Sequence, residues 1–158
     1  MERDEEIGLL DMKKTGLIDF VINSVRLGRS MAKGKYTPAG SVTLAKNEDG
    51  VLASGILNYI NVVGIMLYLS GHTRPEISFT VNYFARYIFF PKHLHGEYLK
   101  RIGWYVKLTQ DCGLILNPNM VLFKIDSYTD SDFSGMYGHE NPNDTDCVKS
   151  GAVYVIKC

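Results

Sequence analysis

Three closely spaced aspartates are the residues of this sequence best suited to chemistry. Asp126, Asp130 and Asp132 follow the apolar run 121–125. In a β-strand, alternate residues project from one face, so the three carboxylates would share that face. A divalent cation would relieve their mutual repulsion, and paired carboxylates are ligands that Mg²⁺ accepts. The stretch is therefore a candidate metal site. The alternative is a strand that ends in an ordinary polar turn.

The same residues also match the beginning of a calcium-binding loop. Asp130, Asp132, Ser134 and Gly135 occupy the first, third, fifth and sixth positions of an EF-hand loop. The match fails at position twelve, where Asn141 stands in place of the bidentate glutamate. A strand pattern, and not a helix, also precedes the loop. A calcium-binding module that uses loop 130–135 is thus the alternative function, and it comes from a different class.

A second candidate site is a basic helix face in the middle of the chain. In the helix expected after Pro91, Lys100, Trp104 and Lys107 recur at the i, i+4, i+7 spacing, with Arg101 alongside. Positive charge suits a phosphate backbone, and an exposed aromatic ring suits a base or a sugar. The alternative is a solvated helix face that includes one tryptophan.

Composition and charge are those of a globular protein with an uneven charge distribution. The 158 residues are 46% hydrophobic and 22% charged, with a net charge of zero. Residues 51–110 carry six basic and two acidic side chains, whereas residues 111–158 carry three basic and seven acidic ones. The three cysteines form no CxxC motif, and the sequence holds no signal peptide and no apolar run of membrane length. We expect a soluble, intracellular protein with no membrane partner.

Helical periodicity predicts four helices. The first starts near Gly16 and would end at Gly28, and the run 56–70 predicts a buried helix that Gly71 ends. Thr73 and Glu76 have the spacing of a capping box for the third helix. The expected inner faces are Ile77, Val81, Phe84, Ala85 and Ile88 in the third helix and Leu94, Tyr98, Ile102, Tyr105 and Val106 in the fourth. His93 and His95 are expected to be a helix-start pair and not metal ligands, because i, i+2 positions do not share a helical face.

Strand patterns occupy the last third of the chain. Residues 113–116 and 121–126 predict a hairpin, and residues 152–156 predict a last strand. Residues 1–14 are expected to form a frayed lead-in, and residues 29–55 a long connection between two packing units. The fold class is therefore α+β. A sheet of two or three strands without a covering layer is poorly buried, so we expect these strands to be the start of a domain.

Short motifs follow one another in an order that resembles a known family. The strongest are Gly-His-Thr-Arg-Pro-Glu-Ile at 71–77, Leu-Lys-Arg-Ile-Gly at 99–103 and Gly-Leu-Ile-Leu at 113–116. Asp-Phe-Ser-Gly at 132–135 and Cys-Val-Lys-Ser at 147–150 follow. Together they resemble the C-terminal part of a copia-type retrotransposon Pol polyprotein, where reverse transcriptase passes into ribonuclease H. No single motif is specific, but their order and spacing are.

The resemblance implies a domain organisation. Residues 1–50 would be a lead-in helix and a long connection at the end of the reverse transcriptase palm region. Residues 51–110 would be a helical unit like the thumb and connection, which grips a template–primer duplex by its backbone. Residues 111–158 would be the first strands of a ribonuclease H-like domain whose sheet is incomplete.

The resemblance also implies roles for the candidate residues. Lys100, Arg101 and Lys107 suit the grip on a template–primer duplex or an RNA–DNA hybrid. Asp130 corresponds to an aspartate that holds Mg²⁺ in ribonuclease H, where it is catalytic, and Asp132 is its neighbour in the candidate metal site. The implied partners are such nucleic acids and the rest of the Pol polyprotein.

The sequence departs from the family in ways that predict a loss of activity. The Tyr-x-Asp-Asp motif of the polymerase would lie before residue 1, and the remaining acids of ribonuclease H would lie after Cys158. Trp104 and Ile60 stand where the family usually has arginine. We therefore expect an inactive remnant, whose parent performed RNA-directed DNA synthesis and RNA–DNA hybrid cleavage. Residual nucleic-acid binding by residues 100–107 is left open, as is the alternative of a piece excised from a working polyprotein.

Overall fold

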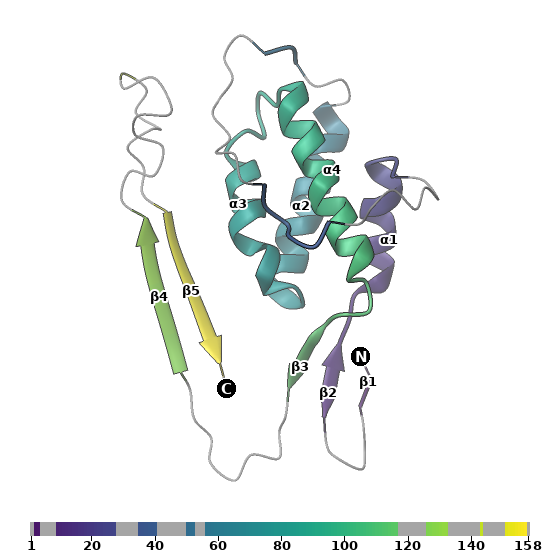
Figure 1. The fold of residues 1–158 in the computed structure, drawn as a ribbon, viewed down its shortest axis with the longest axis vertical. Coiled ribbons are helices and arrows are strands. Elements are labelled where there is room, and N and C mark those ends of the chain that lie inside the picture. The colour runs from purple at the N-terminus through teal and green to yellow at the C-terminus, as the bar shows by residue number, and fades with distance from the viewer. Residues whose placement is uncertain are drawn as a thin grey trace.

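The computed structural model describes residues 2–3, 9–27, 35–40, 50–52, 56–116, 126–132, 143 and 151–157. Within these residues, two short strands come first, the helices follow as one block, and three strands come last (Figure 1). The elements are β1 (Glu2–Arg3), β2 (Leu10–Met12), α1 (Thr15–Ser24), α2 (Ile56–His72), the 3₁₀ helix η1 (Pro75–Ile77), α3 (Ser78–Ala85), α4 (His93–Leu108), β3 (Leu114–Leu116), β4 (Asp126–Asp132) and β5 (Gly151–Lys157). The predicted α+β class is confirmed.

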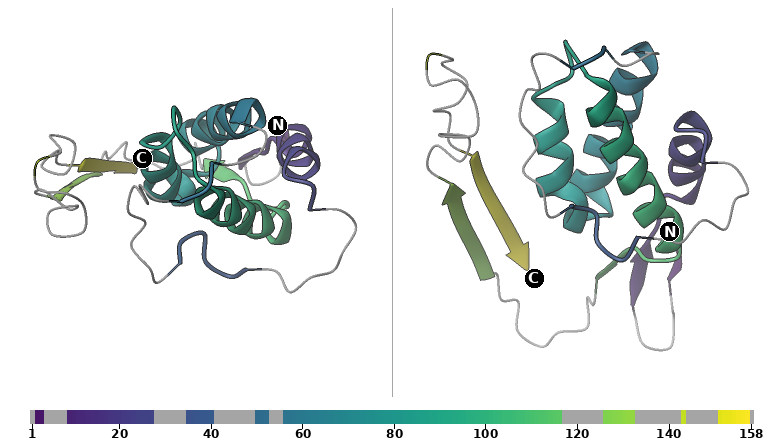
Figure 2. Two further views of the ribbon diagram at one scale, coloured as in Figure 1. Left: turned by 90° about the horizontal axis from the view of Figure 1, so that it is seen from above. Right: turned by 45° about the horizontal axis from the view of Figure 1, so that its top comes forward.

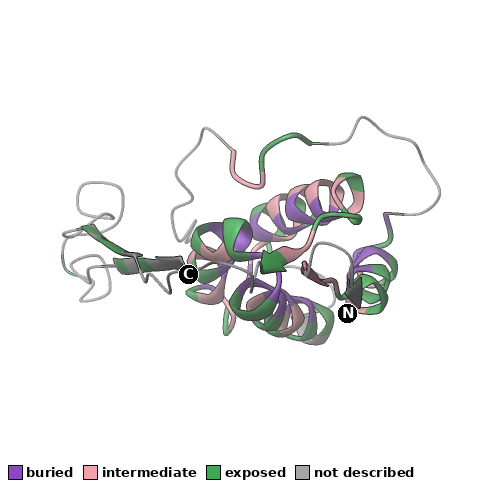
Figure 3. Ribbon diagram, turned by 90° about the horizontal axis from the view of Figure 1, so that it is seen from below, coloured by how far each residue is buried: buried purple, intermediate pink, exposed green. Residues whose placement is uncertain are grey.

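Helix α2 forms the centre of the core. Val62, Val63, Met66 and Leu69 are fully buried there, and α2 contacts α1, α3 and η1. Figure 3 shows the buried positions on the sides of the helices that face one another. The predicted buried helix is confirmed, although it continues through Gly71 to His72.

A buried tyrosine links α2 to α3. The Tyr59 hydroxyl donates a hydrogen bond of 3.2 Å to the Phe84 carbonyl at the end of α3. Burial raises the pKa of the Tyr59 phenol above its usual range, since the phenolate would lose its hydration. The hydrogen bond and the ring's packing therefore join two helices that are also held by apolar contact.

Helix α4 is rotated relative to the predicted inner face. Its buried positions are His95, Leu99, Ile102, Gly103 and Val106, which is an i, i+4, i+7, i+8, i+11 series. The predicted inner residues Ile102 and Val106 are confirmed, whereas Leu94 is 42% exposed, and Tyr98 and Tyr105 are only partly buried. Two of the buried positions are not apolar side chains, so hydrophobic periodicity missed them.

His95 and Gly103 explain that rotation. The His95 ring accepts a hydrogen bond of 3.0 Å from the Lys92 backbone N–H and stacks on Tyr87 at a centroid distance of 4.2 Å. This places His95 at the start of α4, as predicted. Gly103 lies against the end of α1, where an added Cβ would be 2.8 Å from Leu27 Cδ1 and 3.0 Å from Val25 Cγ2.

The predicted capping box is wrong. The Thr73 hydroxyl is buried and has no hydrogen-bond partner among the described residues. Arg74 is the residue that precedes η1, and its side chain does not cap the helix. The predicted inner face is nevertheless confirmed for Ile77, Val81 and Phe84, which are buried. Packing of this face, and not a cap, therefore fixes α3.

Helix α1 ends earlier than Gly28, which lies outside the described residues. Its last residue is Ser24, and Arg26 adopts a positive φ of 54°. The Leu27 N–H then donates a hydrogen bond of 3.1 Å to the Ile22 carbonyl. This six-to-one bond after a left-handed residue is the Schellman arrangement that ends many helices.

The first strands form a sheet that the sequence did not indicate. Residues 1–14 were expected to be frayed, but β1 pairs with β2, and β2 pairs with β3 in antiparallel register from Leu10↔Leu116 to Met12↔Leu114. The predicted hairpin of residues 113–116 with residues 121–126 stays a prediction, because residues 117–125 lie outside the described residues. Local patterns cannot show a pairing between strands so far apart in sequence.

Strands β4 and β5 form a separate antiparallel pair. The register runs from Asp126↔Lys157 through Asp130↔Val153 to Asp132↔Gly151. The predicted last strand is confirmed, and the acidic stretch itself is a strand. The two strands lie beside α3, on the opposite side of the helices from α1 (Figures 1 and 2).

The observed face of α4 can be tested by paired truncations. We expect Ile102→Ala to lower the free energy of unfolding by about 2–5 kcal/mol, because Ile102 is fully buried. Leu94→Ala should cost less than about 1 kcal/mol, because Leu94 is exposed. Urea unfolding followed by circular dichroism measures both. Equal losses would contradict the observed rotation of α4.

Candidate nucleic-acid interface

All four predicted nucleic-acid-binding residues lie on α4. Lys100 is exposed, and its ammonium lies 2.6 Å from the Glu97 carboxylate one helical turn away. Both side chains are about half exposed, so water screens the pair and its net contribution is below about 1 kcal/mol. A phosphate can therefore compete with Glu97 for Lys100 at small cost.

Trp104 and Lys107 form a second pair on the same helix. The Lys107 ammonium lies 5.1 Å from the centre of the Trp104 ring, within the range of a cation–π contact. Trp104 is partly buried and packs against the hydrophobic core. The Trp104 ring therefore contacts the Lys107 ammonium on one side and the core on the other. It is less accessible for stacking on a nucleic-acid base than the sequence suggested.

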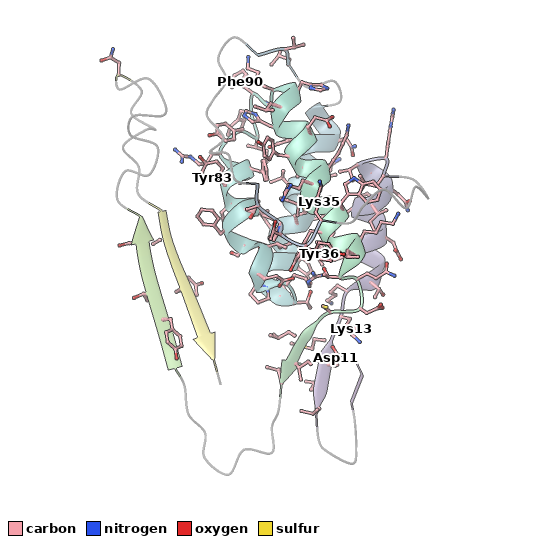
Figure 4. The ribbon with its side chains drawn as sticks, viewed as in Figure 1. Asp11, Lys13, Lys35, Tyr36, Tyr83 and Phe90 are labelled. Carbon is pink, nitrogen blue, oxygen red and sulfur yellow. The ribbon has the colours of Figure 1, made fainter. Side chains whose placement is uncertain are left out.

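Arg101 makes contacts that the sequence did not indicate. Its Nε donates a hydrogen bond of 3.1 Å to the Ala39 carbonyl, and its Nη2 donates one of 2.9 Å to the Thr37 hydroxyl. Thr37 in turn donates to the Ala39 carbonyl at 3.1 Å. Arg101 thus ties residues 35–40 to α4, and Figure 4 shows Lys35 and Tyr36 of this segment in front of the helices.

Arg74 is a buried cation that sequence reasoning placed only inside a capping box. Its guanidinium donates 2.6 Å and 3.1 Å hydrogen bonds to the Glu76 carboxylate and the Thr109 carbonyl, and it also bonds the Thr109 hydroxyl. It lies 5.8 Å from the centre of the Tyr105 ring. Because Thr109 caps the C-terminal end of α4, Arg74 fixes that end against η1. An arginine directly before a proline, between two predicted helices, was the available signal.

The structure describes the backbone of the acidic stretch, which forms strand β4. Asp126, Asp130 and Asp132 take three of the four alternate positions on one face of β4, the other being Tyr128, whereas an EF-hand loop would begin after a helix. The three aspartate side chains lie outside the part of the chain whose side chains are described, as do Ser134 and Gly135. Three carboxylates on one strand face are a donor set that fits Mg²⁺. Elsewhere among the described residues, no three His, Cys, Asp or Glu residues come together as metal ligands.

The helices do not have the character of membrane spans. Among the described residues, none is both long enough and apolar enough to cross a bilayer.

Comparison with known proteins identifies relatives among retrotransposon polyproteins. The chain is 30% identical over 125 residues to the retrovirus-related Pol polyprotein from transposon RE2 of Arabidopsis thaliana, a match that covers 79% of this chain and 8% of that protein. It is 31% identical over 104 residues to the corresponding polyprotein from transposon RE1 of the same plant, covering 66% of this chain and 7% of that protein.

A third relative comes from a different organism. The chain is 31% identical over 77 residues to the secreted RxLR effector protein 161 of Plasmopara viticola, a match that covers 49% of this chain and 54% of the effector. No family model and no solved structure matches the chain. The chain spans less than a tenth of the length of the two Pol polyproteins. It is related to a segment of the Pol polyproteins of copia-type retrotransposons, as the order of its motifs predicted.

Proposed function

We propose that this chain is a remnant of a reverse transcriptase–ribonuclease H segment that binds an RNA–DNA hybrid or a template–primer duplex through α4. The observation that carries the proposal is the placement of Lys100 and Lys107 on one helix, outside its buried face. Seven residues of helix span about 10 Å, which is about three nucleotides along one strand. The two ammoniums can therefore reach phosphates of the same strand.

The contacts of Lys100 and Lys107 within α4 support this proposal. Among the described residues, Lys100 forms an exposed ion pair with Glu97, and Lys107 lies over Trp104. A cation–π contact contributes about 0.5–2 kcal/mol depending on its exposure, and a phosphate that binds Lys107 has to offset the part of it that is lost. Two phosphate contacts release few counterions, and binding should be weak and sensitive to salt.

We also propose that the chain has no catalytic activity of its own. Two-metal hydrolysis needs carboxylates from several elements to clamp both ions. Asp130, with Asp132 beside it, would hold Mg²⁺, which when bound would activate water for hydrolysis of the RNA strand. The partner strand β5 carries no acidic residue. The paired strands therefore offer carboxylates from one strand only, which is too few to position two ions.

Binding can be tested by fluorescence anisotropy with a labelled blunt RNA–DNA hybrid. We expect the affinity of the intact chain to fall between about 50 and 200 mM salt. Replacing both Lys100 and Lys107 by alanine should reduce the slope of log affinity against log salt by about 2. Lys14→Ala, an exposed lysine before α1, is the matched control and should leave the slope unchanged. A chain that binds no hybrid at low salt would sink the proposal.

The absence of catalysis is tested with the same hybrid labelled in its RNA strand. In the presence of Mg²⁺ we expect no cleavage by the intact chain and none by Asp130→Asn, because one strand of carboxylates cannot hold two ions. Gel electrophoresis of the RNA strand measures this. Cleavage by the intact chain that Asp130→Asn abolishes would show a working metal site.

A further inference from the structure

Residues 35–40, called the strap here, lie across α4 in a defined conformation. Arg101 holds the strap by two hydrogen bonds, one to the Ala39 carbonyl and one to the Thr37 hydroxyl. Gly40 lies so close to α4 that an added Cβ would be 2.9 Å from Tyr98 Cε1. The strap is thus anchored by a charged side chain at its centre and by close packing at its end.

The beginning of the strap is turned to solvent. Tyr36 is 88% exposed, the highest value among the large hydrophobic side chains that the structure describes, and Lys35 beside it is also exposed. Figure 4 shows both residues in front of the helices. An ammonium next to an exposed ring is the pair of groups that single-stranded nucleic acid binds, with phosphate on one and a base on the other.

A duplex cannot use the Tyr36 ring in this way. Bases inside a duplex are stacked on their neighbours, so a protein ring can stack only on an unpaired base. Arg101 bonds the strap and follows Lys100 in sequence, so the strap contacts α4 next to Lys100. A nucleic acid with a duplex part and an unpaired part could therefore contact both surfaces.

We propose that the strap binds the unpaired nucleotides that continue from a duplex held by α4. This inference rests on the proposed function. Tyr36 stacks on an unpaired base, Lys35 pairs with its phosphate, and Arg101 is a positioning residue that keeps the strap on α4. The ligand class is a hybrid with a single-stranded overhang, and not a blunt duplex.

The experiment compares a blunt RNA–DNA hybrid with the same hybrid carrying a single-stranded DNA overhang, both in anisotropy titrations of the intact chain. The overhang should tighten binding by roughly fivefold or more, the value of one stacked base. Tyr36→Ala should remove this gain, whereas Tyr36→Phe should keep it, because the stacking face remains. Lys35→Ala should lower the salt slope for the overhang probe by about 0.7.

Arg101 is tested by non-additivity. Arg101→Ala and Tyr36→Ala should each remove the increase in affinity that the overhang gives, if Arg101 acts by holding the strap. The double variant should then lose no more affinity for the overhang probe than either single variant. Thr37→Val removes the hydroxyl that Arg101 bonds without changing charge, and it should lose part of the gain. Additive losses in the double variant would overturn the positioning role.

The outcomes separate the strap from the proposed function. Blunt-hybrid binding that depends on Lys100 and Lys107, with no gain from the overhang, overturns the strap proposal alone. Overhang binding that depends on Tyr36, without blunt-hybrid binding, supports single-strand binding by the strap but overturns the duplex grip of α4 and the coupling of the two surfaces. If neither probe binds, both proposals are wrong.

Discussion

The approach of α4 to the end of α1 at Gly103 is the contact on which the arrangement of this chain depends. A Cβ at this position would lie 2.8 Å from Leu27 Cδ1 and 3.0 Å from Val25 Cγ2, so a larger residue would have to displace these two buried side chains. The contact sets the rotation of α4 about its axis. With that rotation, Ile102 and Val106 enter the core, and the hydrophobic contact area of α4 is fixed against α1. The helix cannot turn without opening this packing.

The surface chemistry follows from the same rotation. Lys100 and Lys107 are left outside the buried face, beside Glu97 and Trp104 respectively. The Arg101 side chain donates hydrogen bonds to Ala39 and Thr37 of the strap. Asp126, Asp130 and Asp132 all lie on β4, which pairs with β5, and a two-stranded pair by itself is marginally stable in water. The helical unit is therefore the scaffold of this chain, and its function is best sought on α4.

Sequence patterns located the elements that depend on local periodicity. Two buried faces were predicted because their apolar residues recur at helical spacing. They are the apolar run of α2 and the stripe of Ile77, Val81 and Phe84 in η1 and α3. The buried face of α4 was predicted incorrectly because it includes His95 and Gly103, and a pattern of apolar side chains does not register a histidine or a glycine as buried. The β2–β3 pairing and the Arg101–strap contacts join segments far apart in the chain, and no local pattern encodes them. The positions of the site residues on one helix could thus be predicted, whereas their partners could not.

Lysine footprinting tests most directly the central claim, that α4 is the nucleic-acid-binding surface. The intact chain is acetylated briefly with and without a blunt RNA–DNA hybrid at low salt, and modification at each lysine is read by mass spectrometry. We predict that the hybrid protects Lys100 and Lys107 and leaves Lys14 equally reactive in both samples. Equal modification of Lys100 and Lys107 with and without the hybrid, or protection that is uniform over all lysines, would contradict the account.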